Sequence, residues 1–276
     1  MTPAQSFVAT LDHPWRFLRT EFRRWAPATY GLAVLSVLPN IVTQVASGQM
    51  IDPSDMTKLN FAALGAVYAA TCVTVLFSVF AQLGAYVVVW RVLENGKCTF
   101  GEALVGAASP RMLVLGGSVL LFQMIGSSCI FGGPLLAVLF GFAPIATLAM
   151  PGQWFRCWGV ALERALRRTS PRDAGMPGWK LGALTLTWYI LLQALTQLVV
   201  IPTFGWMIWH VVSTIGQNDP RALFDMSPPA AISAVTVILS TALKPFSDMY
   251  LAAGSALLWR DVVRLRTGAD LEASLG

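Results

Sequence analysis

The sequence predicts an all-α polytopic membrane protein with six transmembrane helices and amphipathic surface helices. Of its 276 residues, 55% are hydrophobic and only 12% are charged, whereas soluble domains carry about 25% charged residues. The mean hydropathy is +0.62. Apolar runs long enough to cross a bilayer alternate with short connectors rich in arginine. Together these observations place the chain among integral membrane proteins.

The last apolar segment, residues 229–259, shows the pattern most clearly. At about 1.5 Å per residue, a helix of this length crosses a bilayer together with its headgroup zones. Lys244, Pro245 and Asp248 interrupt the apolar run, and a basic tail follows it. We expect this segment to be the sixth span and residues 260–276 to form a cytoplasmic tail.

An amphipathic surface helix is predicted for residues 1–25. Its apolar residues recur at helical spacing: Phe7, Leu11, Trp15, Leu18 and Phe22. Arginines, Arg23 and Arg24 among them, occupy the remaining positions. A helix of this kind lies in the headgroup plane with its arginines towards anionic lipid.

The first two spans are predicted from apolar runs that flank a short acidic loop. The first run covers residues 26–46, and Pro39 predicts a kink within it. The second covers residues 59–93 and is longer than a bilayer needs, so the helix is expected to tilt or protrude. Small residues four apart, from Ala62 to Ala70, predict close packing of its first half against another helix.

The third, fourth and fifth spans follow. Residues 112–150 form an apolar stretch about twice as long as one span needs. A hairpin of two spans is therefore predicted, with a tight turn at Gly132-Gly133-Pro134. The fifth span is expected from Trp179 to about Ile201, where Pro202 kinks the helix.

Basic amphipathic segments at residues 7–24, 97–111 and 157–172 each lead into a pair of spans. This order predicts three copies of one unit, a surface helix followed by a helical hairpin. Spans two, four and six also end alike, with tryptophan close to arginine. The alternative is that tryptophan and arginine collect at every membrane boundary, without any internal repeat.

The distribution of basic residues predicts the orientation. Sixteen of the nineteen lysines and arginines fall on one side of the predicted membrane, whereas Lys58 and Arg221 lie on the other and Lys244 lies within it. Both termini are therefore expected in the cytoplasm, with residues 1–276 forming a single membrane domain of the bacterial cytoplasmic (inner) membrane. The net charge of +5 then needs no nucleic-acid partner.

The basic segments also supply candidate contacts to lipid headgroups. These are Arg23, Arg24, Arg164, Arg167, Arg168, Arg264 and Arg266. Anionic membrane lipids are the partners that such arginines favour. The alternative is that the arginines serve only to set the topology.

Lys244 and Asp248 are a candidate functional pair inside the membrane. They are four residues apart, which is about one helical turn, near the middle of the sixth span. Ionisable residues at this depth usually face the bundle interior or a wet cavity and often mark an ion or substrate path. A purely structural pair that neutralises itself beside Pro245 is the alternative.

No catalytic constellation is recognisable. His13 and His210 are predicted on opposite sides of the membrane, so neither completes a triad or a metal site. The four cysteines lie far apart and are interpreted as small buried hydrophobic residues. The sequence contains no phosphate-binding glycine motif. We therefore expect neither a cofactor nor a metal, and no enzymatic activity.

Several stretches resemble a bacterial six-helix membrane family. They are residues 100–104, the connector 161–170 with Trp179, and the end of the chain from Tyr250 to Leu271. The family is the membrane domain that precedes some glycerophosphodiester phosphodiesterases, together with its stand-alone relatives. Trp259 and Thr267 depart from it, because a tyrosine and an acidic residue are more usual there. No phosphodiesterase domain follows, so the resemblance implies an architecture and no activity.

Two functions remain open after this comparison. The first is a non-enzymatic inner-membrane protein that binds lipid or serves as a scaffold or accessory subunit of a membrane complex, in the latter case with other membrane proteins as partners. The second is a small transporter or channel-like component that uses Lys244 and Asp248. An enzyme acting on lipid ranks third, because no polar cluster at the membrane surface can be assembled from the sequence.

Overall fold

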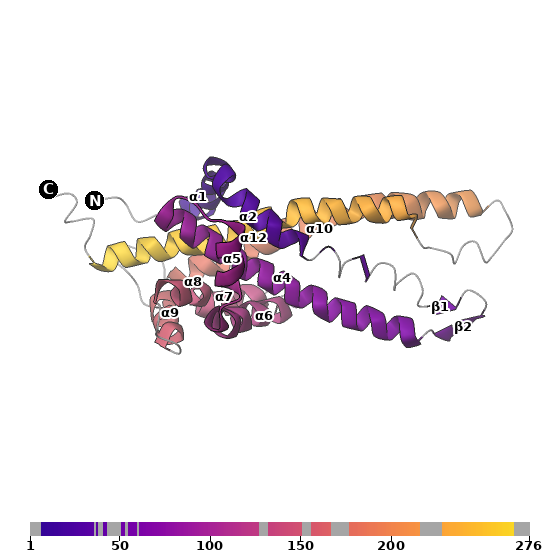
Figure 1. Ribbon diagram of the computed structural model, residues 1–276. Helices are drawn as coiled ribbons and strands as arrows, with labels where there is room; N and C mark the ends of the chain where they lie inside the picture. The colour runs from indigo at the N-terminus through magenta and orange to yellow at the C-terminus, as the bar shows by residue number, and fades with distance from the viewer. Residues whose placement is uncertain are drawn as a thin grey trace. The chain divides into compact units, whose positions relative to one another are not determined.

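The computed structural model is helical almost throughout, with one short β-hairpin (Figure 1). It describes residues 7–35, 37, 41–42, 51–52, 55–59, 61–126, 132–150, 156–166, 177–215 and 228–267. The elements are α1 (Phe7–Thr20), α2 (Phe22–Val34), β1 (Ile51–Asp52), β2 (Asp55–Leu59), α4 (Phe61–Asn95), α5 (Phe100–Ala107), the π-helical turn η1 (Met112–Gly116), α6 (Gly117–Gly126), α7 (Gly132–Phe140), α8 (Ala143–Ala149), α9 (Arg156–Leu166), α10 (Pro177–Thr214) and α12 (Ala230–Thr267).

Within the described residues, three helices are long and apolar enough to cross a membrane. They are Leu64–Asn95, Gly132–Ala149 and Pro177–Thr214. A fourth is present if Phe100–Ala107 and Met112–Phe122, which are bent by 72°, form one broken span. The predominantly helical, membrane-compatible character predicted from the sequence is thus confirmed. Six spans stay a prediction, because the first predicted span is described only in part and the predicted sixth, α12, is not among these helices.

One predicted break falls elsewhere, and two helices continue through a proline. Gly132-Gly133-Pro134 opens α7 instead of forming the turn before it, and proline fits there because the first N–H groups of a helix have no helical acceptor. Helix α10 continues past Pro202 to Thr214. Helix α12 likewise passes through Pro245 and continues to Thr267, so the start of the predicted tail is helical. Neighbouring groups often compensate for a proline in an apolar helix.

The chain divides into two compact units. Unit 1 comprises Met1–Leu32, Val79–Leu191 and Pro245–Gly276, and unit 2 comprises Ala33–Ser78 and Leu192–Lys244. The three longest helices, α4, α10 and α12, contribute to both units.

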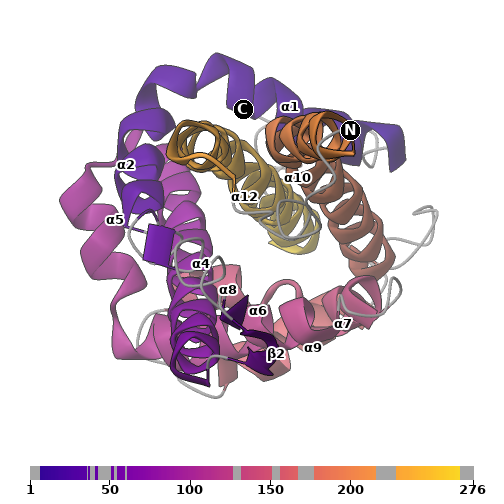
Figure 2. The same cartoon turned by 90° about the vertical axis from the view of Figure 1, so that its right-hand side faces the viewer.

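Unit 1 holds a densely packed core with several fully buried aromatic side chains: Trp25, Tyr86, Phe142, Tyr250 and Trp259. Helices approach one another closely at glycines in this unit. A Cβ added at Gly106 of α5 would lie 2.6 Å from Val87 Cγ1 of α4, and one added at Gly254 of α12 would collide with Leu184 of α10. Figure 2 shows α5 beside α4 in this arrangement.

Four short helices of unit 1 form a cluster of their own. Helix α6 packs against α7, α7 packs against α9, and α8 packs against both α9 and η1. Figure 1 shows these helices side by side. The connector helix α9 is amphipathic, since Cys157, Ala161 and Ala165 recur every four residues and all three are fully buried. Its small residues allow α9 to lie close to α7 and α8.

Unit 2 contains the β1–β2 hairpin and parts of the three long helices. The hydroxyl of Thr203 on α10 lies 3.2 Å from that of Thr236 on α12, which joins these helices by a hydrogen bond. Of the small residues four apart in the first half of α4, Ala62 and Ala66 are exposed and Ala70 is buried. Close packing along this face stays a prediction.

Candidate functional site

The N-terminal helix α1 is fixed to α12 inside unit 1. The hydroxyl of Tyr250 donates a hydrogen bond to the Leu11 carbonyl at 3.2 Å, and the rings of Trp15 and Tyr250 lie 5.0 Å apart. Of the predicted apolar stripe, Leu18 is buried, whereas Trp15 and Phe22 are 39% and 41% exposed. The amphipathic helix is confirmed, but part of its apolar face packs on protein.

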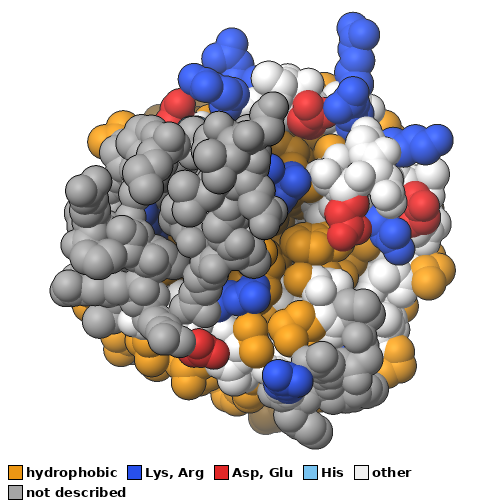
Figure 3. All heavy atoms as spheres, turned by 90° about the vertical axis from the view of Figure 1, so that its left-hand side faces the viewer, with side chains coloured by type: hydrophobic (Ala, Val, Ile, Leu, Met, Phe, Trp, Pro, Cys, Tyr) orange, Lys and Arg blue, Asp and Glu red, His pale blue; other side chains and the backbone are white. Residues whose placement is uncertain are grey.

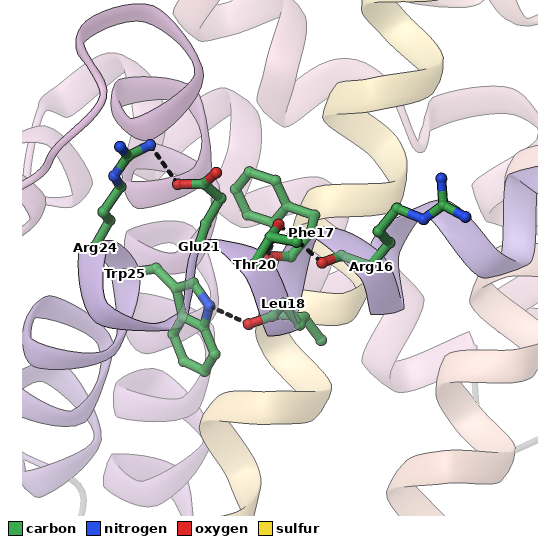
Figure 4. Close-up of polar contacts among 7 residues, drawn as sticks. All are labelled: Arg16, Phe17, Leu18, Thr20, Glu21, Arg24 and Trp25. Carbon is green, nitrogen blue, oxygen red and sulfur yellow. Dashed lines mark hydrogen bonds and ion pairs between the residues drawn. The ribbon is translucent and has the colours of Figure 1, made fainter.

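A sharp break at Glu21 separates α1 from α2 (Figure 4). The indole N–H of Trp25 donates to the Leu18 carbonyl at 3.0 Å across the break. Arg24 and Glu21 point towards one another and form an ion pair of 2.6 Å. Arg24 remains exposed in this pair, with 56% of its side-chain surface accessible.

A hollow of about 800 Å³ lies at this break, and we call it the N-terminal hollow. Basic and aromatic side chains dominate its lining: Trp15, Leu18, Arg19, Thr20, Glu21, Phe22, Arg23, Arg24 and Phe246. The ring of Phe246 on α12 stacks 6.1 Å from that of Phe22. The N-terminal hollow thus collects two of the arginines that the sequence singled out, Arg23 and Arg24.

A second hollow, of about 320 Å³, lies where helices α4, α8, α9 and α12 meet in unit 1. We call it the α9–α12 hollow. It is lined by Trp90, Ala149, Met150, Arg164, Trp259, Arg260, Val263 and Arg264. Three arginines and two tryptophans therefore share one small space. On the face of unit 1 drawn in Figure 3, Lys and Arg side chains project around a central hydrophobic area.

Arg164 occupies a defined position in the α9–α12 hollow. Its guanidinium carbon lies 4.0 Å from the centre of the Trp259 ring, which is the geometry of a cation–π interaction. The Trp259 ring also meets Phe142 edge-on at 5.4 Å. Because Trp259 is 2% exposed, it provides a rigid support for the charged group.

Arg111 contacts one residue that follows α8 and one residue of α9, close to the α9–α12 hollow. One of its terminal nitrogens donates to the Met150 carbonyl at 2.5 Å and to the Cys157 sulfur at 2.9 Å. These contacts tie the end of α8 to the beginning of α9. Sequence reasoning counted Arg111 only as a topology charge, because nothing in the spacing of residues 111, 150 and 157 predicts their contact.

The remaining candidate arginines are placed as follows. Arg164 and Arg264 line the α9–α12 hollow. Arg167 and Arg168 lie outside the described residues. Arg266 belongs to α12, and its side chain is outside the described part. Arg260, which the sequence did not single out, joins the hollow because it follows Trp259 on α12.

Lys244 and Asp248 both lie on α12. Asp248 is only 5% exposed, and Lys244 is half-buried. Their four-residue spacing puts both on one side of the helix. The buried position of Asp248 agrees with the expectation that this residue does not face lipid.

The cysteines and histidines form no recognisable reactive site in the described part of the chain. No group of three or more His, Cys, Asp or Glu side chains there could hold a metal ion. Cys98 and Cys157 are buried as expected, Cys72 is exposed, and Cys129 lies outside the described residues. Burial raises the pKa of the Cys98 thiol to about 11, and the nearby Glu102 carboxylate acts in the same direction. His210 stacks on Trp206 at 5.0 Å.

Comparisons with known proteins give no family assignment. No protein-family model matches the chain, and neither a characterised protein nor a solved structure does. The resemblance to the membrane domain associated with glycerophosphodiester phosphodiesterases therefore stays a prediction from the sequence.

Proposed function

We propose that this chain is a non-enzymatic integral protein of the bacterial cytoplasmic membrane. In this proposal it binds anionic lipid, or it serves as a scaffold or accessory subunit of a membrane complex. The observation that carries the proposal is the gathering of arginines and aromatic side chains in two hollows of unit 1. Arginine attracts lipid phosphates, and tryptophan favours the headgroup level of a bilayer.

The surfaces of the long helices support a membrane location. Only 22% of the apolar window of α10 is buried within the protein. Large apolar side chains such as Ile208, Trp209 and Val212 are about two-thirds exposed. Contiguous exposed apolar surface of this kind is rare on water-soluble monomers and suits contact with lipid or with another membrane protein.

The proposed topology has six spans, with both termini and the connectors 91–111 and 156–180 in the cytoplasm. Single cysteines introduced at Ser54 and Asn218, in a chain whose own cysteines are replaced, should react with an impermeant thiol reagent added outside cells. Both positions lie outside the described residues. Labelling of a cysteine at Ser170 from outside would contradict the topology.

A small transporter or channel-like component is the second candidate. The observation that favours it is Asp248, a carboxylate that is 5% exposed in the middle of a long helix. An ionisable group in such a place is costly unless the site uses it or pairs it. Transport of a solute by proteoliposomes, lost on Asp248→Asn, would favour this candidate over a scaffold.

Purification in mild detergent, followed by identification of the lipids and proteins that remain bound, tests the first candidate. Enrichment of anionic lipids over their share of the membrane supports lipid binding. A membrane protein recovered in fixed ratio supports the scaffold. A preparation with neither contradicts both forms of the proposal.

A further inference from the structure

The α9–α12 hollow has the composition of a site for an anion attached to an apolar group. Arg164, Arg260 and Arg264 contribute three positive charges to its lining. Clustered arginines attract anions, and their guanidinium groups suit phosphate and carboxylate oxygens. The hollow therefore favours a negatively charged ligand.

The geometry favours phosphate as the anion. Guanidinium groups donate hydrogen bonds in a planar fork that matches two oxygens of a phosphate. The Arg164 guanidinium lies over the Trp259 ring at 4.0 Å. The Arg164 side chain is therefore already ordered, and it loses less conformational freedom when an anion binds. A volume of about 320 Å³ is at the lower end of ligand pockets, so it suits a headgroup and not a whole lipid.

The rest of the lining indicates what carries the phosphate. Trp90, Met150 and Val263 place apolar surface beside the arginines. A phosphate joined to a glycerol and acyl chains presents charge and apolar surface side by side, whereas a free phosphate ester presents only charge. Trp90 and Trp259 also belong to the residue type that lies at the headgroup level of a membrane.

We infer that the α9–α12 hollow binds the phosphate headgroup of one anionic membrane lipid, with Arg164, Arg260 and Arg264 contacting the phosphate oxygens. This inference rests on the proposed lipid-binding function and assigns it to one site. The N-terminal hollow is the competing location on the same molecule, because Arg19, Arg23 and Arg24 line it.

The test is native mass spectrometry of the full chain titrated with phosphatidylglycerol, and with phosphatidylcholine of the same acyl chains. The hollow variant carries Arg164→Gln, Arg260→Gln and Arg264→Gln. The matched control carries Arg91→Gln, Lys97→Gln and Arg156→Gln, three exposed basic residues of unit 1 that line neither hollow. Both variants lose the same charge.

We expect the hollow variant to bind the first phosphatidylglycerol at least about tenfold more weakly than the wild type, and the control to change little. Equal losses in both variants, or no loss in either, would overturn the inference while leaving general lipid binding intact. Wild-type protein that retains no lipid under any condition contradicts the proposed lipid binding itself. Glycerol 3-phosphate is added as a soluble competitor. If it displaces the lipid at an equal concentration, the ligand is a soluble phosphate ester and the assignment to a lipid is wrong.

A second measurement uses only wild-type protein, so it does not depend on the folding of a variant. Phosphatidylglycerol with a photoreactive headgroup is crosslinked, and the modified peptides are identified. Crosslinks to the segments of Met150 and Val263 support the site. Crosslinks confined to α1 and α2 would overturn it.

Discussion

The guanidinium carbon of Arg164 lies 4.0 Å from the centre of the Trp259 ring, although the two residues are far apart in the sequence. Arg164 comes from the connector helix α9, and Trp259 comes from α12. The indole ring of Trp259 also packs edge-on against the ring of Phe142. The contact thus joins the short amphipathic helix α9 to the C-terminal part of the long helix α12.

A double-mutant cycle with Arg164→Gln and Trp259→Leu measures this contact. We expect a coupling free energy of about 0.5–2 kcal/mol, because a cation over an indole ring gains more when both groups are shielded from water. Thermal or denaturant unfolding in detergent provides the measurement. Arg156→Gln, at an exposed position of the same helix, combined with Trp259→Leu is the control and should be nearly additive. Equal coupling in the two cycles would contradict the assignment.

Arg111 is expected to be a positioning residue for the α9–α12 hollow. Arg111→Gln removes the hydrogen bonds to the Met150 carbonyl and the Cys157 sulfur, and we expect it to lower the free energy of unfolding by about 1.5–3 kcal/mol. Arg91→Gln, which removes the same charge at an exposed position on α4, is expected to change stability by less than about 0.5 kcal/mol. If Arg111→Gln changes neither stability nor lipid affinity, Arg111 does not position the hollow and the assignment is wrong.

Cys98 should react slowly with thiol reagents while the protein is folded. Burial, assisted by the Glu102 carboxylate, raises the pKa of this thiol from 9.0 to about 11, and only the thiolate is nucleophilic. In a variant with Cys98 as its single cysteine, the alkylation rate at pH 9 should rise sharply when the protein is denatured. Equal rates in folded and denatured protein would contradict this environment.

The same shift predicts a dependence of stability on pH. The folded protein keeps the Cys98 proton at a pH where the unfolded chain has lost it, so the contribution is fully present below pH 9.0 and is lost as the pH rises towards 11. Cys98→Ala should remove this part of the alkaline loss of stability. A pH profile of unfolding for both proteins checks the direction.

The long helices could be predicted from the sequence because each spans a sufficiently long apolar run. Helices α4 and α10 begin within about two residues of the predicted starts. The Gly132-Gly133-Pro134 break was harder, because the same three residues suit a turn and the first turn of a helix. The helix predicted to continue through Pro202 is present, and α10 extends on to Thr214, because neighbouring groups often compensate for a proline in an apolar helix.

The candidate site could be predicted only in part. Composition identified Arg23, Arg24, Arg164 and Arg264 as surface arginines, and each of them lines a hollow. Their grouping into two hollows, and the partners Trp259 and Phe246, depend on contacts between distant segments. Periodicity shows which residues share a helix face, but it does not show how far that face is covered. Leu18 is buried, whereas Phe22 on the same predicted stripe stacks on Phe246 and is still 41% exposed.

The last prediction concerns Lys244 and Asp248 on α12. Asp248 is 5% exposed, and a buried carboxylate is stable in its charged form only with compensation from nearby groups. Four residues advance a helix by slightly more than one turn, so Lys244 is positioned to provide that compensation. Removing one member should therefore destabilise the protein more than removing both.

Asp248→Asn alone is expected to lower the melting temperature in detergent, with a loss of about 3 kcal/mol if the pair is dry. The double variant Lys244→Met and Asp248→Leu should recover much of that loss, because no charge is then left without its counterpart. A double variant that is as unstable as Asp248→Asn would show that the two charges do not compensate each other. If instead the double variant is stable but does not complement a deletion strain, the pair has a function beyond stability. That result favours the transporter proposal over the scaffold proposal. Full restoration by a stable double variant would make the pair structural, because a proton or ion path through α12 cannot operate once both ionisable groups are gone.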